Sequence, residues 1–187
     1  MPAQTPELAA TNNLAELEKK IKSGANWFYW IAGLSLINSL IILFGGEWNF
    51  IFGLGITQVI DAVGQAMAEE NGGAMSFKIV ALALSAGGVA TYALFGWLAS
   101  RHQSAGFVIG MVFYGCDTFI FLAAGDFVGV GFHVFALFLM GRGSQALREW
   151  QRLARQAVET VTAEPAPAPE VMAEAVEEVA EKVPAGD

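Results

Sequence analysis

Residues 27–44 read WFYWIAGLSLINSLIILF, eighteen residues without a charged side chain. A run of this length and apolarity can cross the hydrocarbon core of a bilayer as a single α-helix. The aromatic residues Trp27, Tyr29 and Trp30 at its start suit the headgroup region of a membrane. This stretch therefore predicts an integral membrane protein and not a soluble domain.

Three more apolar stretches follow, over about 79–99, 105–123 and 127–141. The last is short for a span, but it can cross if its helix continues past Gly141 and Arg142, with the arginine reaching back to the headgroups. We therefore expect an all-α integral membrane protein with about four transmembrane helices in two hairpins.

The segment 50–67 (FIFGLGITQVIDAVGQAM) is harder to place. It is apolar, but Gln58, Asp61 and Gln65 recur at helical spacing and form a polar stripe. It is compatible with a fifth span, a re-entrant half-helix or an interfacial helix. Four spans put nearly all lysines and arginines on one side, as the positive-inside bias requires. The prediction is therefore four spans of the cell (inner) membrane, a re-entrant or interfacial 50–67 on the outer side, and both termini in the cytoplasm.

Polar segments flank these spans. Asn13 and Glu16 form a capping-box pattern, which predicts that a short interfacial helix begins there after a disordered N-terminus. Residues 144–158 combine an apolar stripe with arginines and predict a cytoplasmic amphipathic helix. The predicted division is a disordered N-terminus at 1–12, a helical membrane domain at 13–158 and an acidic Pro/Ala-rich tail at 159–187.

Charge and cysteine content exclude several classes of function. The net charge is −8, of which the tail at 159–187, with eight acids and one base, carries −7. The acidity therefore belongs to the tail and says nothing about an acidic-site enzyme or a nucleic-acid partner. We expect no nucleic-acid partner. The single cysteine, Cys116, excludes an internal disulfide and a multi-cysteine zinc site, and we expect it to be a small packing residue. The expected partners are the lipid bilayer, a second copy or another membrane protein, and a cytoplasmic partner for the tail.

Two stretches resemble each other within the chain. SLIILFGGEWNFIFGLGITQ starts at Ser39 and TFIFLAAGDFVGVGFHV starts at Thr118. Each has an apolar helix end, small residues, an acid, a phenylalanine and a G-x-G. Either an internal duplication or the chance likeness of two apolar segments accounts for this. A duplication would relate two hairpins of the same direction, which favours four spans.

The strings GLGITQVID and AGDFVGVGFHVFALF resemble those of small, uncharacterised multi-span membrane proteins of bacteria. The resemblance covers roughly residues 12–155. It implies a fold and no activity.

Ionisable side chains within apolar spans are costly and therefore point to a site. Asp117 and His133 lie about seven residues on either side of the turn at 124–126, so two antiparallel helices bring them to matching depth. The candidate polar pocket consists of Asp117, His133, Asn38, Gln58 and Asp61. It has two interpretations: a site for a proton, cation or small polar ligand, or hydrogen bonds such as Asp117–His133 and Asn38–Gln58 that hold the helices together.

Other polar and small residues have simpler interpretations. Asp61 taken alone suits the water interface better than a buried site, and Asp126 suits a helix N-cap. Gly106 and Gly110 form a GxxxG that predicts close helix packing.

The sequence contains no hydrolase, phosphate-binding or metalloprotease motif, and we expect no enzyme activity, cofactor or metal. The leading expectation is a non-enzymatic structural, accessory or assembly component of a membrane. The alternative is a small transporter, channel or proton/ligand-responsive protein that uses Asp117 and His133.

Overall fold

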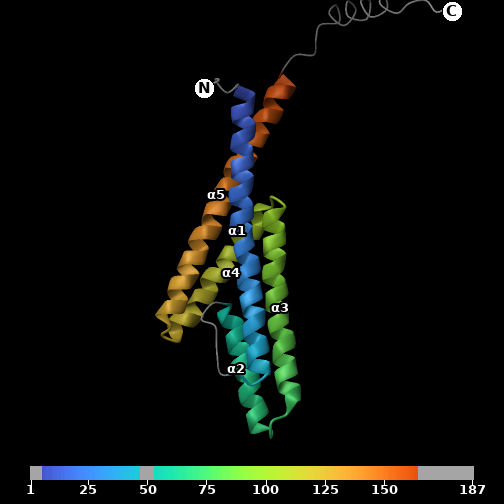
Figure 1. Cartoon of the computed structure of the whole chain (residues 1–187), viewed down its shortest axis with the longest axis vertical. Helices are drawn as coiled ribbons and strands as arrows, with labels where there is room; N and C mark the ends of the chain where they lie inside the picture. Colours follow the sequence, from blue (N-terminus) through green and yellow to red (C-terminus); the bar gives the residue numbers. More distant parts are fainter. Residues whose placement is uncertain (1–5, 47–52, 164–187) are drawn as a thin grey trace, which may run out of the picture. The chain divides into compact units, whose positions relative to one another are not determined.

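The computed structural model describes residues 6–46 and 53–163, which form five α-helices (Figure 1). Four of them are long and apolar enough to cross a membrane, and the fifth, α2, is shorter. The prediction of an all-α, multi-pass membrane protein is therefore confirmed at this level. The bounds are α1 Pro6–Leu43, α2 Gly55–Glu70, α3 Met75–Ser100, α4 Ser104–Ala123 and α5 Phe127–Ala163.

The first and last helices are longer than the sequence predicts. α1 begins at Pro6 and not at Asn13, so the expectation of disorder over residues 1–12 is wrong for residues 6–12. Proline is favoured at the first position of a helix because its missing N–H would have no partner there. α5 runs unbroken through Gly141 and Arg142 to Ala163, so the short fourth span and the amphipathic helix are one element. The tail beyond Ala163 lies outside the described residues.

α1 and α4 end in the same way. Gly45 and Gly125 follow the two helices with φ of +78° and +73°, in the left-handed region that glycine adopts at little cost. Asp126 then caps α5, because its Oδ1 accepts the backbone N–H groups of Val128 (3.1 Å) and Gly129 (2.9 Å). The prediction of a cap at Asp126 is confirmed. In the second segment of the predicted repeat α5 starts directly after Asp126, whereas the corresponding part of the first segment, residues 47–52, lies outside the described residues.

Glycines allow the long helices to approach closely. A Cβ on Gly24 of α1 would lie 2.7 Å from the Cα of Gly143 on α5. A Cβ on Gly106 of α4 would lie 2.6 Å from the backbone nitrogen of Ala99 on α3, and one on Gly110 would overlap the Phe28 ring. Both glycines predicted to pack helices thus lie at contacts between helices of this chain.

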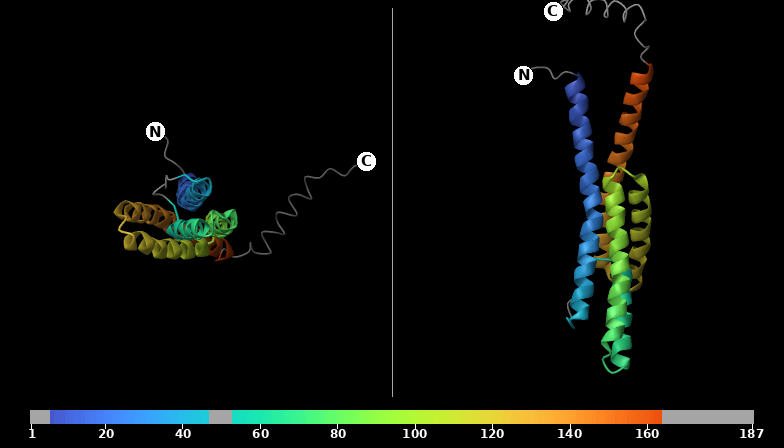
Figure 2. Two further views of the ribbon diagram at one scale, coloured as in Figure 1. Left: turned by 90° about the horizontal axis from the view of Figure 1, so that it is seen from below. Right: turned by 90° about the vertical axis from the view of Figure 1, so that its right-hand side faces the viewer.

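The helices bury both apolar and polar side chains, and large apolar side chains also cover the outside of the bundle. Val112, Phe119 and Phe138 are at least 60% exposed, as suits side chains that face lipid. Figure 2 shows α2 alongside the longer helices, and α2 contacts α1, α3 and α4. The buried polar residues are Ser35, Asn38, Ser39, Thr57, Asp61, Ser85, Asp117, His133 and Ser144. Most of them surround α2, which therefore positions the candidate site.

Candidate functional site

The N-terminus of α2 is buried. Leu54 precedes the helix and is fully buried, and its N–H donates to the hydroxyl of Ser35 on α1 at 2.7 Å. Leu54 offers no side-chain cap for the helix. The first N–H groups of a helix have no partner within the helix, and leaving them unpaired away from water is costly. α2 therefore requires acceptors from elsewhere in the chain.

Asp117 of α4 supplies those acceptors. The N–H of Gly55 donates to its Oδ2 at 2.7 Å, and the N–H of Ile56 donates to its Oδ1 at 2.9 Å. A carboxylate at a helix N-terminus gains charge-assisted hydrogen bonds and faces the positive end of the helix dipole. Asp117 therefore caps a helix that begins about sixty residues earlier in the chain.

His133 of α5 completes the arrangement. Its Nε2 lies 3.1 Å from Asp117 Oδ2, and its Nδ1 lies 2.8 Å from the carbonyl oxygen of Gly129. The ring is fully buried and stacks on Tyr114, with ring centroids 4.2 Å apart and planes at 17°. The sequence-predicted pair of Asp117 and His133 thus lies within hydrogen-bond distance.

One contact of the His133 ring assigns a donor. A carbonyl oxygen only accepts, so the Nδ1 of His133 donates to the carbonyl oxygen of Gly129. The Nε2 on the other side of the ring then faces Asp117 Oδ2 at 3.1 Å. An acid and an imidazole in direct contact can pass a proton between them.

Three further residues belong to the predicted pocket. Asn38 and Gln58 lie near the start of α2, whereas Asp61 lies apart from them. Asn38 is buried on α1 beside the start of α2, where its side-chain nitrogen would lie 3.1 Å from a Cβ on Gly53. Gln58 has a buried Nε2 without a partner among the described residues, so the predicted hydrogen bond from this nitrogen to Asn38 is not made. Asp61 lies further along α2 and has partners of its own.

Asp61 forms the second polar cluster. The hydroxyl of Ser39 on α1 donates to its Oδ2 at 2.5 Å, and that of Ser85 on α3 donates to its Oδ1 at 2.9 Å. The Asp61 residue is 4% exposed, so its placement at the water interface was wrong. The cause is the packing of α2 between α1 and α3, which covers the face of α2 that carries the carboxylate.

Sequence reasoning missed Ser85 and Tyr114. Ser85 is a serine within an apolar span, which by itself indicates no site. Its role became visible only through its hydrogen bond to the Asp61 carboxylate. Tyr114 lies three residues before Asp117, so one helical face carries both, which was a usable signal. Its ring is fully buried, and its hydroxyl has no partner among the described residues. Cys116 is exposed, so the expectation that it packs inside was wrong.

A third polar group lies near the start of α1. His102, in the turn between α3 and α4, contacts Glu18 at 2.5 Å and stacks on Trp150 of α5 with ring centroids 4.4 Å apart. Glu18 also pairs with Lys22 at 3.1 Å. His102 thus links α1 and α5 to the turn between α3 and α4.

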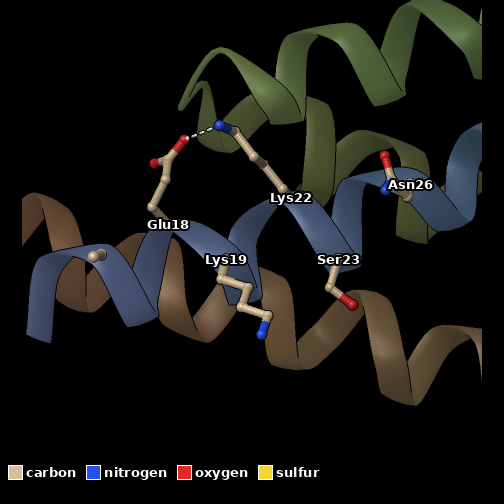
Figure 3. A pocket seen from close by; sticks show the side chains of 6 residues that line it. Glu18, Lys19, Lys22, Ser23 and Asn26 are labelled. Carbon is tan, nitrogen blue, oxygen red and sulfur yellow. Dashed lines mark ion pairs between the residues drawn. The ribbon is translucent and has the colours of Figure 1, made fainter. Parts of the chain in front are cut away.

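The same part of α1 borders an open hollow of about 440 Å³. Figure 3 shows Glu18 and Lys22 on one side of α1, with Lys19 and Ser23 on the other. This is a charged and polar surface with no arrangement typical of catalysis among the residues drawn.

The described residues contain no group of three or more histidines, cysteines or acids that could hold a metal ion. Comparisons with protein-family models, curated proteins and solved structures found no match, so the geometry of this chain is the basis for its function.

Proposed function

We propose that this protein is a non-enzymatic accessory or assembly component of the cell (inner) membrane, with both termini in the cytoplasm and α2 re-entrant from the outer side. The observation that carries the proposal is the length of α1 and α5, with 38 and 37 residues. At 1.5 Å per residue each is roughly 55 Å long, against a hydrocarbon core of roughly 30 Å. About half of each helix is therefore available outside the core.

The composition of these extensions supports a role in binding partners. The N-terminal half of α1 carries Lys19, Lys20 and Lys22, and the C-terminal half of α5 carries Arg148, Arg152 and Arg155. With four spans both sets face the cytoplasm, where basic side chains near an anionic leaflet are favoured. The extensions then present helical surfaces to a cytoplasmic or membrane partner.

The interior supports a structural role for the polar residues. Both oxygens of Asp117 accept backbone N–H groups of α2, and His133 contacts one of them. These hydrogen bonds hold a buried helix end in place, which agrees with the second of the two interpretations of the polar pocket, hydrogen bonds that hold the helices together.

The test is co-purification from native membranes. The full chain, a chain lacking residues 164–187 and an Arg148→Glu/Arg152→Glu variant are purified in parallel, and the retained proteins are quantified by mass spectrometry. We expect one defined set of proteins to co-purify with the full chain. The amount of these proteins should fall at least several-fold with one of the two altered chains. Identical recovery from all three, or no specific recovery from the full chain, contradicts the proposal.

A proton-responsive protein or small transporter is the second candidate. The buried contact between Asp117 and His133 favours it, because acid–imidazole pairs inside spans serve proton relays. Proteoliposomes test it directly: proton flux through the wild type that Asp117→Asn abolishes would support transport. Proton flux at the background level in both the wild type and Asp117→Asn would contradict this second candidate.

A further inference from the structure

Asp61 is a buried carboxylate without a charged partner. Its two oxygens contact only the hydroxyls of Ser39 and Ser85, which are 2% and 0% exposed. Within the described part of the chain, no lysine, arginine or histidine forms an ion pair with it. A buried ionised carboxylate costs several kcal/mol unless a positive charge compensates it, and two neutral hydrogen bonds recover only part of that cost.

Further oxygen atoms lie around this carboxylate. The Ser85 hydroxyl is 3.4 Å from the carbonyl oxygen of Thr57, so one backbone oxygen adjoins the cluster. The Oε1 of Gln65, one turn further along α2, is buried without a partner among the described residues. Asp61, Ser39 and Gln65 line one small cavity with a volume of about 10 Å³. That is close to the smallest space that holds one water molecule.

We propose that this cluster binds a single sodium ion between α1, α2 and α3. Carboxylate, hydroxyl, carbonyl and carboxamide oxygens are hard donors that suit a hard cation. One carboxylate balances one positive charge, whereas divalent ions usually take several charged ligands or retain several waters. A cavity of this size admits one ion without its hydration shell. The ion compensates the Asp61 charge and gives the Gln65 oxygen a partner. Bound sodium would therefore stabilise the fold. This binding site is additional to the proposed accessory function.

Lys78 adjoins the site, and its positive charge competes with the sodium ion. Its side chain lines the same cavity without an ion pair to Asp61 within the described residues. Lys78 is half-buried near the start of α3, and its positive charge disfavours a second cation in the same cavity. Replacing it with methionine keeps the apolar stem and removes the charge, and this change should increase the affinity for sodium several-fold.

The test uses the full chain purified in detergent. The midpoint of thermal unfolding is followed by tryptophan fluorescence in sodium, potassium and choline chloride at equal ionic strength. We expect sodium to raise the midpoint by about 3 °C at roughly ten times its Kd, and the other salts to raise it much less. Binding of radioactive sodium is measured in parallel. Equal midpoints in the three salts, or no saturable sodium binding by the folded wild type, overturn the proposal.

Variants locate the effect. Asp61→Asn should abolish the response to sodium, whereas Asp126→Asn, which alters an exposed cap, should retain it. If Asp61→Asn does not fold, Ser39→Ala and Ser85→Ala carry the test, since each removes one oxygen and leaves the carboxylate. Each should weaken sodium affinity at least several-fold, and unchanged affinity in both overturns the site. A chain lacking residues 164–187 should keep the response, which separates this result from the test of partner binding.

Discussion

Asp117 and Asp61 are both buried carboxylates, but their surroundings differ. Asp117 contacts α2 from α4, whereas Asp61 belongs to α2 itself. Asp117 accepts two backbone N–H groups at a helix N-terminus and contacts an imidazole. Asp61 accepts two serine hydroxyls and faces a small cavity. A fully partnered carboxylate fixes a structure, whereas one without compensating charge has capacity to bind a cation. The difference separates a structural role from a binding role inside one bundle.

The largest effect should come from Asp117→Ala. It leaves the N–H groups of Gly55 and Ile56 and the ring of His133 buried without their acceptor, a loss of about 3–5 kcal/mol in the free energy of unfolding. Denaturant unfolding in detergent, followed by tryptophan fluorescence, measures it. Asp126→Ala, at an exposed cap, is the control, with an expected loss of about 1 kcal/mol. Equal losses in both variants would show that Asp117 is no more structural than a surface cap.

The next effect should come from His133→Ala, which removes the contact with Asp117 and the ring that stacks on Tyr114. Truncation of a buried ring leaves a cavity, and we expect a loss of about 2–4 kcal/mol in the free energy of unfolding. A double-mutant cycle with Asp117→Asn isolates the contribution of the contact, which we expect to be about 1–3 kcal/mol. A coupling energy near zero would mean that the two side chains are neighbours without a functional hydrogen bond.

Asp61→Asn should have the opposite sign to Asp117→Asn when sodium is absent. The carboxamide keeps an acceptor for a serine hydroxyl and removes the buried charge, so in choline chloride we expect a gain of about 1 kcal/mol in the free energy of unfolding. Asp117→Asn, by contrast, should destabilise, because one of its two acceptor atoms becomes a donor facing an N–H. The same unfolding experiment compares them. Destabilisation of similar size in both would remove the distinction between the two sites.

The smallest effect should come from Tyr114→Phe. The hydroxyl of Tyr114 is buried without a partner in the described part of the chain, so its removal relieves desolvation and keeps the ring that stacks on His133. We expect a change of at most about 1 kcal/mol, neutral or stabilising. A loss of more than this in thermal unfolding would reveal a partner for the hydroxyl and extend the polar centre around Asp117.

Much of the fold follows from local chemistry. The apolar lengths predict four helices able to cross a membrane, and Asp126 before a helical segment predicts its cap. The matching depth of Asp117 and His133 follows from counting residues outward from one tight turn, because helix rise is constant. Helix ends are less predictable: Pro6 and Ala163 bound helices that continue through polar sequence, where hydropathy no longer indicates a boundary.

The sequence by itself determined that the chain belongs in a membrane, because the hydrophobic cost of exposing its apolar runs to water depends on composition alone. It also determined that Asp117 and His133 lie at matching depth, because they are equally far from the turn of one hairpin. Only the tertiary structure decided what Asp117 and Asp61 do. Their partners, Gly55 and Ile56 in one case and Ser39 and Ser85 in the other, lie on helices distant in sequence, and no local pattern records which helix packs against which.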